Sequence, residues 1–153
     1  MNKLLLGAAS AALIATGVFA QNAEVPDNLE KLSNFQSTGT TDFTFIEQSG
    51  DYAEGIRKTL EKITLPPGFK IELYAVVPDA RHMAVGPQGI VTFVGTRKDK
   101  VWSVTDRNKD RVADEVKDFA PSLVFTIPNG PCFSKDRFLY IAEQNRVLLF
   151  PAA

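Results

Sequence analysis

One short segment, "DRNKDRVADE" (residues 106–115), carries side chains of the kind that bind a metal ion. Its oxygen-bearing residues are spaced as the first, third, fifth and ninth positions of a loop, at Asp106, Asn108, Asp110 and Asp114. A hard cation such as Ca²⁺ prefers many oxygen ligands held by a tight turn, and calcium loops of this type place their ligands at these positions. The spacing predicts a calcium site with these four residues as ligands.

A charged hairpin is the alternative interpretation of the same loop. Arg111 occupies the sixth position, where glycine normally makes the sharp turn, and Glu115 falls short of the twelfth position, where a glutamate ligand is usual. Three cationic side chains also partly neutralise the carboxylates of the loop. Asp and Asn in such turns often bond to their own backbone. The missing glycine favours the hairpin interpretation.

His82 is the sole histidine, and imidazole is the natural acid-base group near neutral pH. It lies in "DARHMAVGPQG" (79–89), directly after Arg81. No carboxylate in the local sequence would orient the ring as a working base requires. We therefore expect His82 at a rim or turn position, with its ring hydrogen-bonded to backbone.

Other enzyme chemistries find little support in the residues. There is no Gly-rich phosphate loop, Ser-centred nucleophile elbow or zinc ligand cluster. Cys132, the sole cysteine, can form no internal disulfide and is expected as a buried small apolar residue. Phe93, Trp102 and Tyr140 lie in strand patterns and are expected in the core.

A helix over residues 51–64 is the first regular element that the sequence predicts. Its apolar residues recur at three- and four-residue spacing, which places them on one stripe that docks on the main domain. Asp51 and Glu54 resemble a capping pair, and Pro66-Pro67 stops the helix. The preceding residues 21–50 are mostly polar without a sustained period, and we expect an irregular leader there.

From residue 65 to residue 153 the pattern is strand and turn, and it repeats. The segment "FKIELYAVV" (69–77) alternates as a strand does. A shift of 48 positions places "AVGPQGIVTFVGT" (84–96) on "CFSKDRFLYIAEQ" (132–144), so that Phe93 meets Ile141. After a slightly shorter connection, "KVWSV" (100–104) meets "RVLLF" (146–150). The sequence therefore contains two copies of a three-strand unit.

A period in the forties with several short antiparallel strands is typical of β-propeller blades, although a sandwich of similar hairpins can also give two copies. The segment has room for about two blades, whereas a closed propeller needs at least about four. The finish at "VLLFPAA", directly after an apolar strand, favours a fragment. The expected fold is all-β and of β-propeller type, with about two blades preceded by one short helix.

The N-terminal segment "MNKLLLGAASAALIATGVFA", from Met1 to Ala20, combines one lysine with a short apolar run. It predicts a secretory signal peptide cleaved after Ala20, and so a periplasmic or secreted protein. An uncleaved membrane anchor is the alternative, and the shortness of the run weakens it. The formal net charge of -1, with no long run of either sign, gives no footprint for nucleic acid.

Several motifs from about Leu65 onward carry a family resemblance. They are "LPPGF" (65–69), "MAVGPQGIVTFVGTR" (83–97), the "D-x-N-x-D-x-x-x-D" loop and "PNG" (128–130). This part of the chain, more than half of it, resembles the N-terminal part of the glucose and sorbosone dehydrogenase family. These are exported six-bladed propellers that use pyrroloquinoline quinone.

The resemblance implies oxidation of a sugar or sugar aldehyde, with the quinone and Ca²⁺ as cofactors and a separate electron acceptor. The family's catalytic histidine falls in a segment that this chain does not contain, so no catalytic residue is carried over, and the chain is expected to be inactive alone. Residues at the blade entrances, Arg81, His82 and Asn129, could line a ligand site, with Asn129 as a cofactor contact or simply a turn residue. The alternative function is a non-catalytic propeller-type module that binds a carbohydrate or a protein partner.

Overall fold

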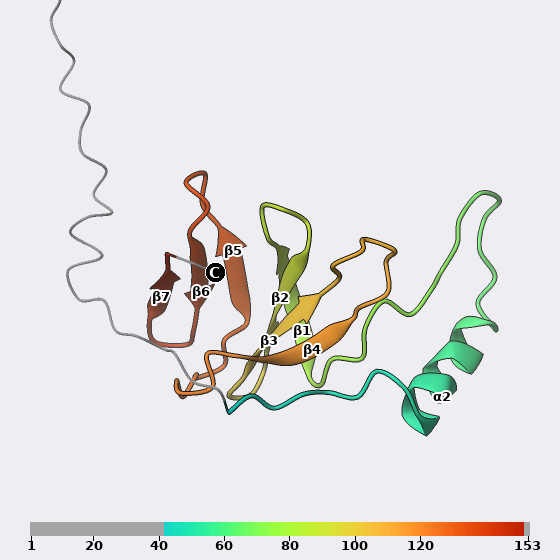
Figure 1. Ribbon diagram of the computed structural model, residues 1–153, viewed down its shortest axis with the longest axis horizontal. Coiled ribbons are helices and arrows are strands. Elements are labelled where there is room, and N and C mark those ends of the chain that lie inside the picture. Colours follow the sequence, from blue (N-terminus) through green and yellow to red (C-terminus); the bar gives the residue numbers. More distant parts are fainter. Residues whose placement is uncertain (1–41, 152–153) are drawn as a thin grey trace, which may run out of the picture. The chain divides into compact units, whose positions relative to one another are not determined.

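The computed structural model describes residues 42–151, and these form one short helix followed by two antiparallel β-sheets (Figure 1). The strands of the first sheet are β1 (Ala80–Val85), β2 (Val91–Thr96), β3 (Val101–Thr105) and β4 (Glu115–Phe119). Those of the second are β5 (Gly130–Phe133), β6 (Leu139–Ala142) and β7 (Val147–Phe150). The prediction of a mostly β chain with one short helix is confirmed. The predicted signal peptide and most of the predicted leader lie outside the described residues.

Helix α2 (Asp51–Leu60) begins where the sequence predicts and ends before the expected boundary at residue 64. Ala53, on the predicted apolar stripe, is fully buried. The predicted capping pair is wrong, because Gly50 is the N-cap and no side chain caps the helix. The Glu54 carboxylate pairs instead with Arg57, one turn further along the helix. Within the described residues no helix is long and apolar enough to cross a membrane.

The segment 69–77 is irregular and does not form the strand that its alternating pattern predicts. At Val76 the backbone is bound by a side chain: Val76 N–H donates to Gln48 Oε1 at 2.7 Å, and Gln48 Nε2 donates to the Val76 carbonyl at 3.1 Å. At Tyr74 the carbonyl accepts the backbone N–H of Ala113 at 2.9 Å, a single bond rather than a strand ladder. The side chains of Ala75 and Val77 pack against the first sheet. Phe69 and Ile71, at the start of the alternating pattern, are exposed, so the alternation does not follow burial.

The end of the predicted leader lies along the outer edge of β4, a strand that the three-strand repeat did not include. Ile46 N–H donates to the Val116 carbonyl at 2.9 Å, and Asp118 N–H donates to the Thr44 carbonyl at 3.0 Å. Phe45 forms an isolated bridge with Lys117. These bonds occupy an edge that would otherwise be open to pairing with another chain.

The strands follow the repeat seen in the sequence. β2 begins at Val91 and β6 at Leu139, and the sequence repeat places these two residues at equivalent positions. β1 and β5 end at Val85 and Phe133, which are also equivalent in the repeat. β3 and β7 correspond in the same way once the shorter connection in the second copy is taken into account. Each sheet therefore contains the same strand, turn, strand, turn, strand unit.

The pairing within that unit differs by one residue between the sheets. Val85 lies opposite Thr92 in the first sheet, whereas Phe133 lies opposite Leu139 in the second, one residue before the position that the sequence repeat gives. A slip of one residue exchanges the two faces of a strand. The structural counterpart of Ile141 is therefore Val94, and the predicted match of Phe93 with Ile141 is wrong.

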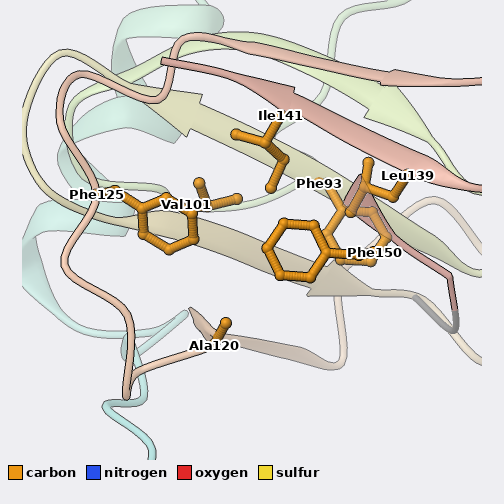
Figure 2. Close-up of a cluster of buried hydrophobic side chains, with 7 residues drawn as sticks. All are labelled: Phe93, Val101, Ala120, Phe125, Leu139, Ile141 and Phe150. Atoms are coloured by element: carbon orange, nitrogen blue, oxygen red, sulfur yellow. The ribbon is translucent and has the colours of Figure 1, made fainter. Parts of the chain in front are cut away.

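The main core lies between the two sheets (Figure 2). The first sheet contributes Phe93 and Val101, and the second contributes Leu139, Ile141 and Phe150. Two residues of the connection between the sheets, Ala120 and Phe125, complete the cluster. The Phe119 ring stands edge-on to the rings of both Phe93 and Phe150, with centroids 4.9 and 4.8 Å apart.

A second core covers the other face of the first sheet. Val94, Trp102, Val104, Ala113 and Val116 are buried there beneath Ile46, Ala75 and Val77. The prediction that Phe93 and Trp102 are core residues is confirmed, since their side chains are 4% and 5% exposed. Tyr140 belongs to neither cluster and is only half-buried.

Cys132 is exposed, so its prediction as a buried residue is wrong. It lies opposite Tyr140 in the register of the second sheet, and Tyr140 lies opposite Leu149. These three side chains, with Ala142 and Val147, point away from the main core because strand residues alternate between faces. We call these five residues the open face of the second sheet.

Candidate functional site

The entrances of the two sheets meet at His82 and Asn129. The His82 Nδ1 atom lies 2.8 Å from the carbonyl oxygen of Asn129. A carbonyl oxygen only accepts, so Nδ1 carries the proton in this bond. The prediction of an imidazole hydrogen-bonded to backbone is confirmed, and the bond ties the first strand of one sheet to the segment that leads into the other.

We call Arg81, His82 and Asn129 the junction of the two sheets. A close approach between two backbone segments holds it in place. Thr96 N–H donates to the Pro128 carbonyl at 3.1 Å. A Cβ atom on Gly95 would lie 2.2 Å from the Pro128 carbonyl oxygen and 3.0 Å from Asn129 Cα. Only glycine fits at this contact. No local pattern around Gly95 predicts this need, because it arises from a segment far along the chain.

The junction offers one acceptor and one cation to a ligand. With Nδ1–H bonded to a carbonyl, Nε2 of the neutral ring is an acceptor. Arg81, the neighbouring cation, is exposed, and Asn129 is half-buried. The partner that orients the ring is a backbone carbonyl, whereas a catalytic dyad orients its histidine with a carboxylate.

The quinone that the family resemblance implies carries several carboxylates and needs several converging cations. Arg81 is the cation adjacent to His82, while the nearby Lys98 ammonium is bound to Asp79 at 3.0 Å. This supply of positive charge does not match a ligand with several carboxylates. The described residues therefore do not form the cofactor site by themselves, and no catalytic step is derived through it.

A cavity of about 310 Å³ lies at the other end of β1, between the β1–β2 turn and the second sheet. Its walls come from Gly86, Pro87, Gln88, Ile90, Val91, Phe93, Arg137 and Pro151. Because both sheets contribute walls, the cavity depends on their packing.

The predicted calcium loop connects β3 to β4, and Asp106 begins it. The Asp106 side chain is 5% exposed, and its Oδ2 atom accepts the backbone N–H of Arg111 across the loop at 3.1 Å. Its Oδ1 atom is buried and has no hydrogen-bond partner among residues 42–151. Burying a carboxylate oxygen without a partner is costly, so this atom requires an explanation.

The missing glycine does not prevent the tight turn of the loop. Arg111 itself adopts the left-handed conformation, with a φ of 72°, and Lys109 has a φ of 59°. A glycine would adopt these values more easily. The absence of glycine at position 111 therefore does not count against calcium binding by this loop.

The other three predicted ligands bond within the loop. Asp114 Oδ2 accepts the Arg107 N–H at 2.7 Å, and Asp110 Oδ1 accepts the Val112 N–H at 2.8 Å. Asn108 Nδ2 donates to Asp110 Oδ2 at 2.9 Å. Among the described residues no group of three His, Cys, Asp or Glu side chains forms a preassembled metal cluster. These backbone bonds are the ones that the hairpin interpretation predicts.

An ion pair between a buried carboxylate and a partly exposed lysine at the outer edge of the first sheet was not predicted from the sequence. The Asp118 side chain is 3% exposed; its Oδ2 atom accepts from Lys100 Nζ at 2.8 Å, and its Oδ1 atom accepts from Thr44 N–H at 2.8 Å. Burial alone would raise the pKa of Asp118, but the hydrogen bonds from Lys100 and Thr44 outweigh it and the pKa is lowered. The ionised carboxylate thus fastens residue 44 to β4.

Comparisons with protein-family models, with curated proteins and with solved structures gave no match.

Proposed function

We propose that this chain forms the first two blades of an exported, propeller-type sugar dehydrogenase that uses pyrroloquinoline quinone. Two different supports carry the proposal. The architecture is supported by the way in which the two sheets are related, and the activity is supported by the sequence resemblance over the segment from Leu65 onward.

The relation between the sheets is the observation that carries the architecture. In a propeller every blade packs one face on the preceding blade and the opposite face on the next. The face of the first sheet that contains Val94 corresponds, by register, to the face of the second sheet that contains Ile141. Ile141 packs against the first sheet, as this relation requires.

The same packing relation between successive blades indicates what would cover the open face. The face of the first sheet that contains Phe93 is covered by the second sheet. Its counterpart in the second sheet is the open face, where Cys132 is exposed and Val147 is 64% exposed. A sheet face made of Cys, Tyr, Ala, Val and Leu is suited to burial, and a third blade is the partner that the repeat supplies.

The position of the junction agrees with a ligand site near the centre of a propeller. His82, Arg81 and Asn129 lie where the first strands of two successive blades begin, and these strands line the central channel. Further cations from later blades would complete a site for the carboxylates of the quinone. The two-blade chain alone is expected to be inactive.

Sequencing the coding DNA on the 3′ side of the Ala153 codon tests the architecture. The proposal expects further copies of the blade pattern, one of which contains the catalytic histidine segment. The longer chain, supplied with the quinone, Ca²⁺ and an aldose, should reduce an artificial electron acceptor. Further blades without this activity would favour the binding module, and a stop codon without further copies would contradict the proposal.

A further inference from the structure

We propose that the loop from Asp106 to Asp114, between β3 and β4, binds one Ca²⁺ ion. The site is structural and is separate from any ion at the cofactor of the proposed enzyme. It does not rest on that function, because every ligand belongs to a single hairpin of the first sheet.

The buried carboxylate of Asp106 points to a cation. One of its oxygens accepts the Arg111 N–H, which fixes the carboxylate across the loop, and the other oxygen is buried without a partner among the described residues. Asp106 is 5% exposed, so bulk water does not solvate this oxygen. A bound cation satisfies such an atom, whereas an unpaired carboxylate oxygen costs folding free energy.

The surrounding oxygens provide the rest of a coordination shell. Asn108, Asp110 and Asp114 follow Asp106 at the third, fifth and ninth positions, and the carbonyl of Val112 stands at the seventh, where calcium loops use a backbone oxygen. Ca²⁺ accepts flexible sets of oxygens, whereas Mg²⁺ demands a near-ideal octahedron. A set drawn from one hairpin therefore favours Ca²⁺.

The cationic side chains of the loop oppose binding less than the sequence suggests. Lys109 Nζ donates to the Gln88 carbonyl at 2.9 Å, in the neighbouring β1–β2 turn. An Arg107 guanidinium nitrogen lies 3.5 Å from Glu115 Oε1, outside the four proposed ligands. Two of the three cations are thus directed to other partners, and three carboxylates remain for the ion.

Binding requires a local rearrangement of the ligands. Asn108 Oδ1 accepts the Asp110 N–H at 3.1 Å, and the two carboxylate oxygens of Asp110 accept from Val112 N–H and Asn108 Nδ2. The Asn108–Asp110 side-chain bond must break, and the two backbone bonds must be shared or lost, before both side chains can present oxygens to one ion. Asp114 can keep its bond from Arg107 N–H through Oδ2 while Oδ1 turns to the ion. This cost predicts an affinity near that of extracellular calcium modules, with a Kd of about 10⁻⁴–10⁻³ M.

Calorimetric titration of the EDTA-treated full chain with CaCl₂ tests the proposal. We expect one site per chain, a rise in the thermal unfolding midpoint with added Ca²⁺, and a smaller effect of MgCl₂. Asp114→Asn, at an exposed position, should weaken binding by roughly tenfold or more because it removes one ligand charge. Asp99→Asn, in the exposed β2–β3 turn, is the matched control and should bind as the unmodified chain does.

Three results would overturn the proposal. The first is the absence of both heat and a midpoint shift up to millimolar Ca²⁺, which would leave a charged hairpin with water at Asp106 Oδ1. The second is unchanged binding by the Asp114→Asn variant, which would place the ion elsewhere. The third is an equal loss of binding in the Asp99→Asn control, which would show non-specific attraction of the cation.

Discussion

Replacing Gly95 with alanine should separate the two sheets. The added Cβ would lie 2.2 Å from the Pro128 carbonyl oxygen and 3.1 Å from Pro131 Cδ. Pro128 belongs to the connection that leads into β5, and Pro131 belongs to β5 itself. The nearest atom is backbone, which cannot turn aside as a flexible side chain can. The connection must therefore move away from β2 by about 1 Å to restore ordinary contact.

This movement has a cost that the structure allows us to bound. Overpacking of a filled contact costs about 1–3 kcal/mol. The shift also weakens two hydrogen bonds, Thr96 N–H to Pro128 O and His82 Nδ1–H to Asn129 O, each with a net contribution of about 0.5–1.5 kcal/mol. We expect the free energy of unfolding to fall by about 2–4 kcal/mol, a large share of the stability of a small domain.

Urea denaturation followed by the fluorescence of Trp102 measures the loss. Trp102 is the sole tryptophan and is 5% exposed, so its emission reports the first sheet. Gly55→Ala is the control, because a Cβ there meets no atom within 4 Å, and alanine in a helix interior should stabilise the chain by about 0.5–1 kcal/mol. A Gly95→Ala chain as stable as the unmodified protein would refute the close packing of the sheets.

Three further substitutions probe other contacts. Asp118→Asn should lower the free energy of unfolding by about 1–3 kcal/mol at neutral pH. Because the pKa of Asp118 is lowered in the folded chain, the stabilisation from its carboxylate is present above about pH 4 and is lost as the pH falls through the folded pKa. A series of urea midpoints measured at different pH values checks this dependence. Val147→Lys, on the open face, should reduce self-association in light scattering, whereas Val124→Lys, on an exposed loop, should not. His82→Ala should cost about 0.5–1.5 kcal/mol in the same urea assay, and no change would show that its bond to Asn129 is not formed in solution.

The strands of the repeated three-strand unit could be predicted because local composition determines them, whereas β4 lies outside the repeat and was missed. β2 is a run of β-branched and aromatic residues between turns, and its repeat at β6 gave the second sheet as well. The segment 69–77 has the same kind of pattern but is not a strand. Its backbone is bound at Val76 by the side chain of Gln48 and at Tyr74 by the N–H of Ala113. Both partners are distant in the sequence, and no local pattern reveals them.

Which strand residues point into the core could not be predicted from the sequence, for a related reason. A one-residue slip between β5 and β6 decides whether Ile141 or Tyr140 points into the core. The two strands have apolar residues on both faces, so alternation does not choose between them. The exposure of Cys132 follows from the same ambiguity.

The candidate sites were predicted as residues but not as geometry. The four loop residues and the His82 backbone bond were expected from residue types. The buried oxygen of Asp106 and the left-handed Arg111 depend on how β3 and β4 hold the ends of the loop. Gly95 carries no pattern at all, since its role comes from the Pro128 carbonyl in a distant segment.

Alkylation of Cys132 tests the central structural claim most directly. The second sheet packs one face on the first sheet and leaves the other face open, and the sole cysteine lies on that open face. In the native chain, at concentrations where light scattering shows no self-association, the thiol should react at a rate close to that of the urea-unfolded chain. Strong protection of the native thiol, relieved only by unfolding, would show that this face is covered and would contradict the arrangement of the two sheets.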